Sequence, residues 1–241
     1  MGGTVSPVGV WARISAVAPP PHRVAVLGGL AGALVVLAGL VQGGVLKSVD
    51  QFSADHLMPW LVPGNASGTT AKGFYRPFPL HSPSAIKLLD VWSYPCSVLA
   101  SALIVIFAGA VLWRRHGPVA GVAPAVAWVI ANTIEVIGKG LLTKPGVYGT
   151  AGGQRVHVFP FDDSFPSGHM ARGVVMAWAL ALVWRRAAPW LALWAALVGP
   201  ALVLVSAHTI SDTVGGAFVG LIAVVAAHPL AVAPVAARAP G

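Results

Sequence analysis

The chain has 241 residues, of which 56% are hydrophobic and only 9% are charged, and its mean hydropathy is +0.78. A soluble domain of this length needs far more charge to cover its surface, so these values exclude a soluble globular protein. The net charge of +8 does not indicate nucleic-acid binding, because the pairs Arg114-Arg115 and Arg185-Arg186 each follow an apolar run, as cytoplasmic anchors of membrane helices do. We expect an all-α, polytopic membrane protein with no nucleic acid as partner.

The chain order predicts one membrane domain between two tails. Residues 1–23 are rich in Gly and Pro and contain no acidic residue, which indicates a cytoplasmic tail, and residues 232–241 predict a disordered tail. Residues 47–89 form the longest polar section and predict an external loop that begins with a helix-like interfacial segment. A six-helix domain is therefore expected over residues 24–231. Its spans are the apolar runs near the roughly 20 residues that cross a bilayer, at about 24–46, 91–113, 118–138, 168–184, 188–206 and 209–231.

The distribution of charge predicts the orientation of these spans. Six spans with both termini inside place the arginine pairs and Arg238 in the cytoplasm. The acidic residues then all fall on or near the opposite side: Asp50, Asp55, Asp90, Glu135, Asp162, Asp163 and Asp212. This segregation follows the positive-inside rule, so we expect a multi-pass protein of the plasma membrane whose functional site is extracytoplasmic.

A short motif at residues 164–169, Ser-Phe-Pro-Ser-Gly-His, ends a polar loop and opens an apolar run. Ser167 is a natural helix N-cap, and Gly168 lets backbone amides at the positive end of the helix dipole approach an anion closely. His169 then lies in the first helical turn, where an imidazole can give or take a proton near neutral pH. Such a site favours phosphate. The alternative is a capped helix whose histidine faces a lipid headgroup.

A second motif runs from His208 to Asp212, at the junction of the last two apolar runs. A spacing of four residues puts both side chains on one helix face, so the carboxylate can fix the tautomer of the imidazole and leave its other nitrogen free as a nucleophile. The alternative is a mutually satisfied pair at the membrane edge. Because His169 and His208 open helices that enter from the same side, we expect them to line one shallow pocket at the outer leaflet.

Several cations lie near these motifs in the sequence. Glu135 and Lys139 are four residues apart at the outer end of the third span, where Lys139 can bind a phosphate or form an ion pair with the glutamate. Lys144 and Arg155 in the following loop are further cations that could contact a phosphate. Arg172 lies three residues after His169, on its helix face, and either reaches the pocket or snorkels to the interface. Cys96 is the only cysteine, which excludes an intramolecular disulfide and a cysteine-based metal site.

The motif at residues 164–169, followed by His208-x-x-x-Asp212, resembles the type-2 phosphatidic acid phosphatase superfamily of membrane lipid phosphatases. The resemblance implies a six-helix phosphatase that needs no metal or other cofactor and works through a phosphohistidine. By position, His208 would be the nucleophile, Asp212 its orienting partner and His169 the acid that protonates the leaving oxygen.

The same resemblance assigns the phosphate ligands, and here the chain departs from the family pattern. Ser167 and the amide of Gly168 would hold the phosphate, and Lys139 matches the lysine that opens the first family motif. The Arg-Pro expected seven residues later is Gly146-Val147, and the Ser-Arg expected before the last histidine is Ala201-Leu202. Both arginines that clamp the phosphate are absent, which affects a main source of catalysis in phosphoryl transfer. We hypothesise that Arg172, Arg155 or Lys144 replaces the lost charge.

These features predict an integral membrane phosphatase that hydrolyses a lipid phosphate or diphosphate, either polyprenyl or glycerolipid, at the extracytoplasmic face. One alternative is a lipid phosphotransferase that passes the phosphoryl group from the same histidine to an alcohol. Another is a catalytically silent lipid-binding membrane protein, which the absent arginines favour. The sequence leaves open the lipid, its chain length and the oligomeric state.

Overall fold

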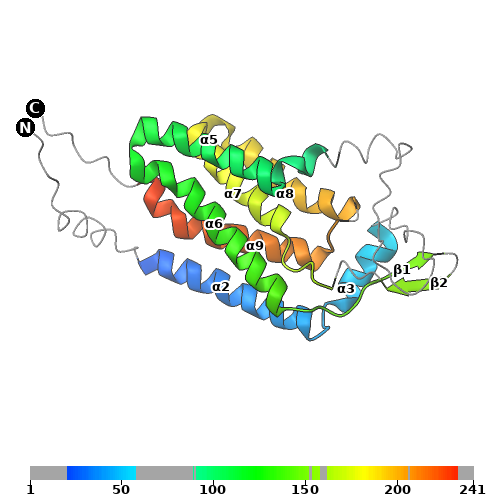
Figure 1. The fold of residues 1–241 in the computed structure, drawn as a ribbon. Coiled ribbons are helices and arrows are strands. Elements are labelled where there is room, and N and C mark those ends of the chain that lie inside the picture. Colours follow the sequence, from blue (N-terminus) through cyan, green and yellow to red (C-terminus); the bar gives the residue numbers. More distant parts are fainter. Residues whose placement is uncertain are drawn as a thin grey trace, which may run out of the picture.

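The structure is a computed structural model that describes residues 21–57, 89, 91–151, 154–157, 162–205 and 207–232. Its long helices lie side by side in one bundle, with a short helix and a hairpin at one end (Figure 1). The helices are α2 (Pro21–Gln42), α3 (Lys47–Phe52), α5 (Val98–His116), α6 (Pro118–Leu141), α7 (Gly168–Val183), α8 (Ala188–Leu204) and α9 (Ile210–Ala231). Short π- and 3-10-helical turns are η1 (Ser53–Leu57), η2 (Tyr94–Cys96) and η4 (Arg185–Ala187).

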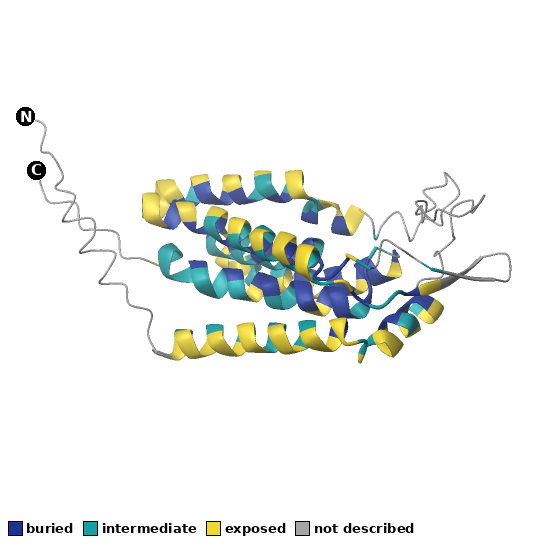
Figure 2. Cartoon of the chain, turned by 60° about the horizontal axis from the view of Figure 1, so that its bottom comes forward, coloured by how far each residue is buried: buried dark blue, intermediate teal, exposed yellow. Residues whose placement is uncertain are grey.

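The predicted class, a polytopic helical membrane protein, is confirmed. Among the described residues, five helices are long and apolar enough to cross a bilayer, namely α2, α5, α6, α9 and α8 together with η4. The fourth predicted run, residues 168–184, forms α7, which is apolar but only 16 residues long. Apolar side chains on the outer faces are exposed, as on α2, where Val35 and Val36 are 70% and 62% exposed (Figure 2). These faces suit contact with lipid tails.

Several predicted boundaries are wrong, for local reasons. The first span starts at Pro21 and ends at Gln42 rather than covering 24–46, because Gly44 adopts a φ of +74° that turns the chain. The second span starts at Val98 rather than residue 91, because Pro95 lies in the separate turn η2 and Ser97 is extended. Most of the two predicted tails and residues 58–88 of the predicted external loop lie outside the described residues.

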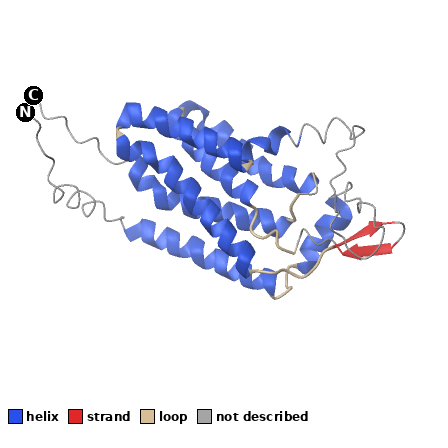
Figure 3. Cartoon of the chain, in the orientation of Figure 1, coloured by secondary structure: helices blue, strands red, loops and turns tan. Residues whose placement is uncertain are grey.

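One short β-hairpin adds to the helical fold and is absent from the sequence prediction. Strands β1 (Tyr148–Ala151) and β2 (Gln154–His157) pair antiparallel, with Tyr148 opposite His157 (Figure 3). The hairpin lies beside α3, and the Gln51 side chain exchanges hydrogen bonds with the Tyr148 backbone, 2.7 Å to the oxygen and 3.0 Å from the nitrogen. The segment before α5 and the segment after α6 therefore meet at one end of the bundle.

Helix α7 forms the centre of the bundle, where it packs against α5, α6, α8 and α9. The core consists of small and branched apolar side chains such as Val175, Val198, Leu202 and Val219. Such a core places helix axes close together and excludes water from the interior.

Helices α7 and α9 approach each other closely at two glycines of α9. A Cβ at Gly216 would overlap the carbonyl oxygen of Ser167, and it would lie 2.9 Å from the Cβ of Met170. A Cβ at Gly220 would lie 2.8 Å from the carbonyl oxygen of Ala171. The backbones of the two helices are therefore in direct contact, which fixes the relative position of their N-terminal ends.

Candidate active site

The motif at residues 164–169 forms the start of α7. Ser167 is the N-cap, as the sequence predicts, and its Oγ accepts a hydrogen bond of 3.3 Å from the amide of Met170. The amide of Ser167 donates to the carbonyl oxygen of Asp212 at 2.9 Å. The loop before α7 is thus tied to the first turn of α9, and the two predicted motifs are neighbours.

The two motif histidines converge at this end of the bundle. The ring centroids of His169 and His208 lie 6.0 Å apart, with an angle of 55° between the ring planes. His169 is in the first turn of α7, and His208 lies in the linker between α8 and α9. Two imidazoles this close together can both contact one phosphoryl group, so the arrangement suits a nucleophile and a proton donor.

Asp212 lies directly behind His208. Its Oδ2 accepts hydrogen bonds from Ser164 Oγ at 2.7 Å and from the amide of Thr209 at 2.9 Å, and lies 3.7 Å from His208 Nδ1. This last distance is too long for a hydrogen bond. Among the described residues, Nδ1 of His208 is a buried nitrogen without a hydrogen-bond partner.

The prediction that His208 and Asp212 meet because they share one helix face is wrong. His208 precedes α9, which begins at Ile210, so the histidine and the aspartate do not share a helix face. They meet because Thr209 and Asp212 form a capping box, in which the aspartate side chain turns back toward the residues before the helix. The same capping box leaves the other oxygen of the carboxylate available to Lys144.

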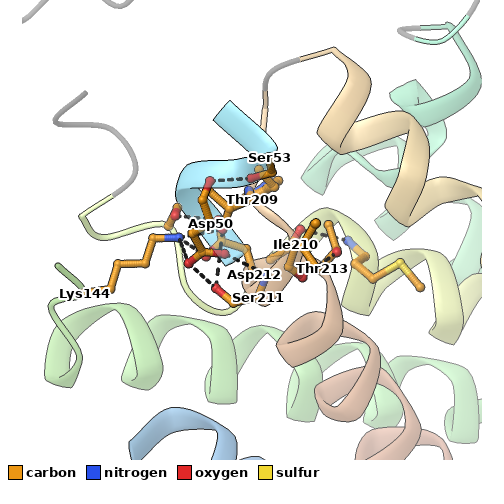
Figure 4. Close-up of polar contacts among 12 residues, drawn as sticks. Asp50, Ser53, Lys144, Thr209, Ile210, Ser211, Asp212 and Thr213 are labelled. Atoms are coloured by element: carbon orange, nitrogen blue, oxygen red, sulfur yellow. Dashed lines mark hydrogen bonds and ion pairs between the residues drawn. The ribbon is translucent and has the colours of Figure 1, made fainter. Parts of the chain in front are cut away.

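Lys144 lies among oxygen atoms, deep in the structure (Figure 4). Its Nζ donates to Asp50 Oδ2 at 3.3 Å, Thr209 Oγ1 at 2.7 Å and Asp212 Oδ1 at 2.8 Å. These three bonds match the three donors of an ammonium group. Sequence reasoning assigned Lys144 to the phosphate and did not include Asp50 in the site, because no local pattern marks a contact between residues so far apart in the chain.

Two other predicted cations lie beside the first turn of α7 and share one carboxylate. Glu135 accepts from Lys139 Nζ at 2.7 Å and from Arg172 Nη1 at 2.6 Å. The carboxyl group of Glu135 lies so close to Gly168 that a Cβ there would overlap it. The ion-pair reading of Glu135 and Lys139 is therefore confirmed, and it brings an anion and two cations to the N-terminus of α7.

Arg172 does not snorkel to the interface. Its side chain is only 4% exposed, and it also donates to the carbonyl oxygen of Cys96 at 2.8 Å and to Asn132 Oδ1 at 2.9 Å. These bonds orient the guanidinium toward α6 inside the bundle. The backbone of Arg155 lies in β2, opposite Thr150, and its side chain lies outside the described residues.

Cys96 is not a candidate nucleophile. Burial raises the pKa of its thiol to about 12, and its side chain is fully enclosed. Reactive cysteines have a lowered pKa and an accessible sulfur. We therefore expect N-ethylmaleimide at about pH 7.5 to leave the folded protein unlabelled and its activity unchanged, and to label it after unfolding in detergent. Mass spectrometry of the intact protein measures both results, and rapid labelling of the folded protein would contradict the buried position.

Comparisons with known proteins identify the fold and the family of this chain. No curated protein sequence matches the chain at a significant level. The structure resembles the crystal structure of a transmembrane PAP2-type phosphatidylglycerolphosphate phosphatase from Bacillus subtilis, with a TM-score of 0.61 and 14% identity over 84% of this chain and 94% of that one. At this identity the likeness shows the fold. The family model described as PAP2 superfamily matches residues 90–233, which include both histidine motifs and more than half of the chain. The chain therefore belongs to the PAP2 superfamily.

Proposed function

We propose that this membrane phosphatase hydrolyses a lipid phosphate or diphosphate at the extracytoplasmic face of the plasma membrane, through a phosphohistidine on His208. The observation that carries the proposal is the convergence of His169 and His208, 6.0 Å apart, with the Asp212 carboxylate behind His208. This arrangement provides a nucleophile, its orienting group and a proton donor from three positions that the fold holds together.

The first half of the reaction forms the covalent intermediate. The neutral imidazole of His208, with its Nδ1–H directed to Asp212, attacks phosphorus through Nε2. The P–N bond forms as the P–O bond to the lipid breaks, and the protonated His169 gives its proton to the leaving oxygen. The Asp212 carboxylate stabilises the positive charge that develops on the imidazole of His208.

The second half returns the enzyme to its starting state. The neutral His169 takes a proton from water, whose oxygen attacks phosphorus as the P–N bond breaks. Inorganic phosphate leaves, and His208 is again neutral. Ser167 and the amide of Gly168 would hold the phosphoryl oxygens at the helix N-terminus, with Lys139 and Arg172 as the neighbouring cations. The three hydrogen bonds of Lys144 support a role behind the nucleophile rather than on the phosphate.

An apolar groove supports a lipid as the substrate. It starts at Met170, the residue after His169, and runs between α7, α8 and α9. Trp178, Leu221 and Val224 line it further along, together with alanines from all three helices. A hydrocarbon chain attached to the phosphate would find apolar surface directly beside the catalytic end of α7.

The decisive experiment measures phosphate release by the purified protein in detergent micelles, against phosphatidylglycerol phosphate, phosphatidic acid, and polyprenyl mono- and diphosphates. The proposal predicts turnover of at least one lipid, equal with and without EDTA. Addition of an alcohol acceptor separates hydrolysis from phosphotransfer, because a transferase forms the phosphorylated acceptor in place of free phosphate. Binding of lipid without any turnover would favour the silent lipid-binding alternative, and loss of turnover in EDTA would refute the metal-free mechanism.

A further inference from the structure

Four ionisable groups form a row from the first polar segment of the chain to the candidate nucleophile. Asp50 on α3 lies 3.3 Å from Lys144, and Lys144 lies 2.8 Å from Asp212, measured between the charged nitrogen and the nearest carboxylate oxygens. Asp212 in turn lies 3.7 Å from Nδ1 of His208. The charges of the first three members alternate in sign, and Figure 4 shows that these three come from separate segments.

These groups lie in the interior of the protein. The exposed fractions of the side chains are 1% for Lys144, 4% for Asp50 and 0% for Asp212. Charges interact much more strongly there than at a wet surface, because water does not screen them. An ammonium group at 2.8 Å would by itself cancel most of the negative charge that Asp212 presents to His208.

Asp50 also fixes the first turn of α9. Its Oδ1 accepts from the amide of Ser211 at 3.1 Å, and its Oδ2 accepts from the hydroxyl of Ser211 at 2.6 Å. Ser211 directly precedes Asp212 in the chain. The side chain of Asp50 therefore both contacts the segment that carries the orienting carboxylate and balances the charge of Lys144.

We propose that Asp50 is a positioning residue for the nucleophile: it offsets the charge of Lys144, so that Asp212 keeps a net negative charge for the imidazole of His208. The inference rests on the proposed phosphohistidine mechanism, in which that imidazole becomes positively charged. Asp50, Lys144 and Asp212 together carry one net negative charge. Removal of Asp50 leaves none, and removal of Lys144 leaves two.

Ionisable groups from four segments lie at His208 or in the row behind it: His169 from α7, Asp212 from α9, Lys144 from the loop after α6 and Asp50 from α3. Asp162 lies beside Lys144, whose amide donates to its carbonyl oxygen, and the Asp162 carboxylate pairs with His157. The next cluster, around Glu135, lies at the start of α7, where Lys139 and Arg172 pair with that carboxylate. The acidic limb of the pH profile of kcat/KM reports the group that must be neutral to attack, which is His208 in this mechanism. A substitution that changes the net charge of Asp50, Lys144 and Asp212 should therefore shift the pH midpoint of that limb.

The test compares the pH profiles of three variants on the lipid that the wild-type protein hydrolyses. Asp50→Asn is expected to move the midpoint of the acidic limb down by about half to one pH unit, because the imidazolium loses a stabilising charge. Lys144→Met is expected to move it up by a similar amount. The double variant retains one net negative charge and should return the midpoint to within about 0.3 unit of the wild-type value. The ionisation of the substrate is common to all variants and cancels in these differences.

Two matched variants separate charge from structure. Ser211→Ala removes a hydrogen bond from Asp50 without a change in charge, and Asp55→Asn removes an exposed carboxylate in the following turn η1. Both should leave the midpoint in place.

Active variants whose acidic limbs all coincide with the wild-type limb would overturn the inference and leave the phosphatase assignment intact. Inactivity of the double variant would also overturn it, because that variant preserves the net charge. An inactive wild-type protein would instead refute the proposed function itself.

Discussion

Replacement of His208 by alanine should abolish phosphate release from every lipid that the wild-type protein hydrolyses. The alanine removes the nitrogen that forms the P–N bond, and Asp212 and His169 cannot act without it. Groups that act as a unit lose nearly all catalysis when one is removed, so we expect turnover to fall at least about 1,000-fold. Phosphate release from micelles measures the rate, and protein quenched in SDS at alkaline pH should carry no acid-labile phosphoryl group.

A histidine near the C-terminal end of α9 provides the control. His228 lies in the last turn of α9, where its Nδ1 accepts from Trp178 Nε1 at 3.3 Å, far along the helix from Asp212. His228→Ala should keep turnover within about twofold of the wild-type value. If His208→Ala retains more than a tenth of wild-type activity, the phosphohistidine mechanism is wrong.

The second large effect is expected from a substitution of Gly216, a residue that takes no part in the chemical steps. The Cβ of Gly216→Ala would overlap the carbonyl oxygen of Ser167, so α7 and α9 would have to separate. Overpacking of a close helix contact typically costs about 1–3 kcal/mol, and the separation would also displace His169 from His208. We expect at least a 10-fold fall in kcat and a lower midpoint of thermal unfolding, because a shift of about 1 Å in a catalytic group can cost about 100-fold.

The matched control is Gly199→Ala on α8, which faces the same Met170 side chain. Its Cβ would lie 3.6 Å from the sulfur of Met170, an ordinary van der Waals distance. We expect wild-type activity and thermal stability for this variant. Equal behaviour of the two variants would show that the α7–α9 contact does not set the distance between the two imidazoles.

The parts of the fold that sequence reasoning predicts correctly are those with a local physical cause. The apolar runs predict the helices because their composition alone suits a bilayer, and Ser167 is found as an N-cap because capping depends on neighbouring residues. The helices that follow the two motifs enter the bundle from the same side, so His169 and His208 lie at one end of the bundle. Their measured separation agrees with that expectation.

The parts that sequence reasoning misses depend on contacts between distant segments. Asp50 and Lys144 are 94 residues apart, and neither forms a pattern with its neighbours that marks the ion pair. The position of Glu135 against Gly168 also requires the packing of α6 on α7, which no motif encodes. The replacement of the two missing arginines by Arg172, Arg155 or Lys144 stays a prediction, and the contacts of Lys144 favour a role behind the nucleophile. The side chain of Arg155 lies outside the described residues.

The length of α7 sets the depth at which a substrate must be held. Its 16 residues span about 24 Å at a rise of about 1.5 Å per residue, whereas the hydrocarbon layer is about 30 Å thick. If the C-terminal end of α7 lies at the inner boundary of the acyl chains, as in the proposed orientation, the first turn and its imidazole lie about 6 Å below their outer boundary. In the proposed reaction a lipid headgroup would then have to sink to that depth, or the leaflet would have to thin locally around the protein, and the water that ends each turnover would have to reach the same depth.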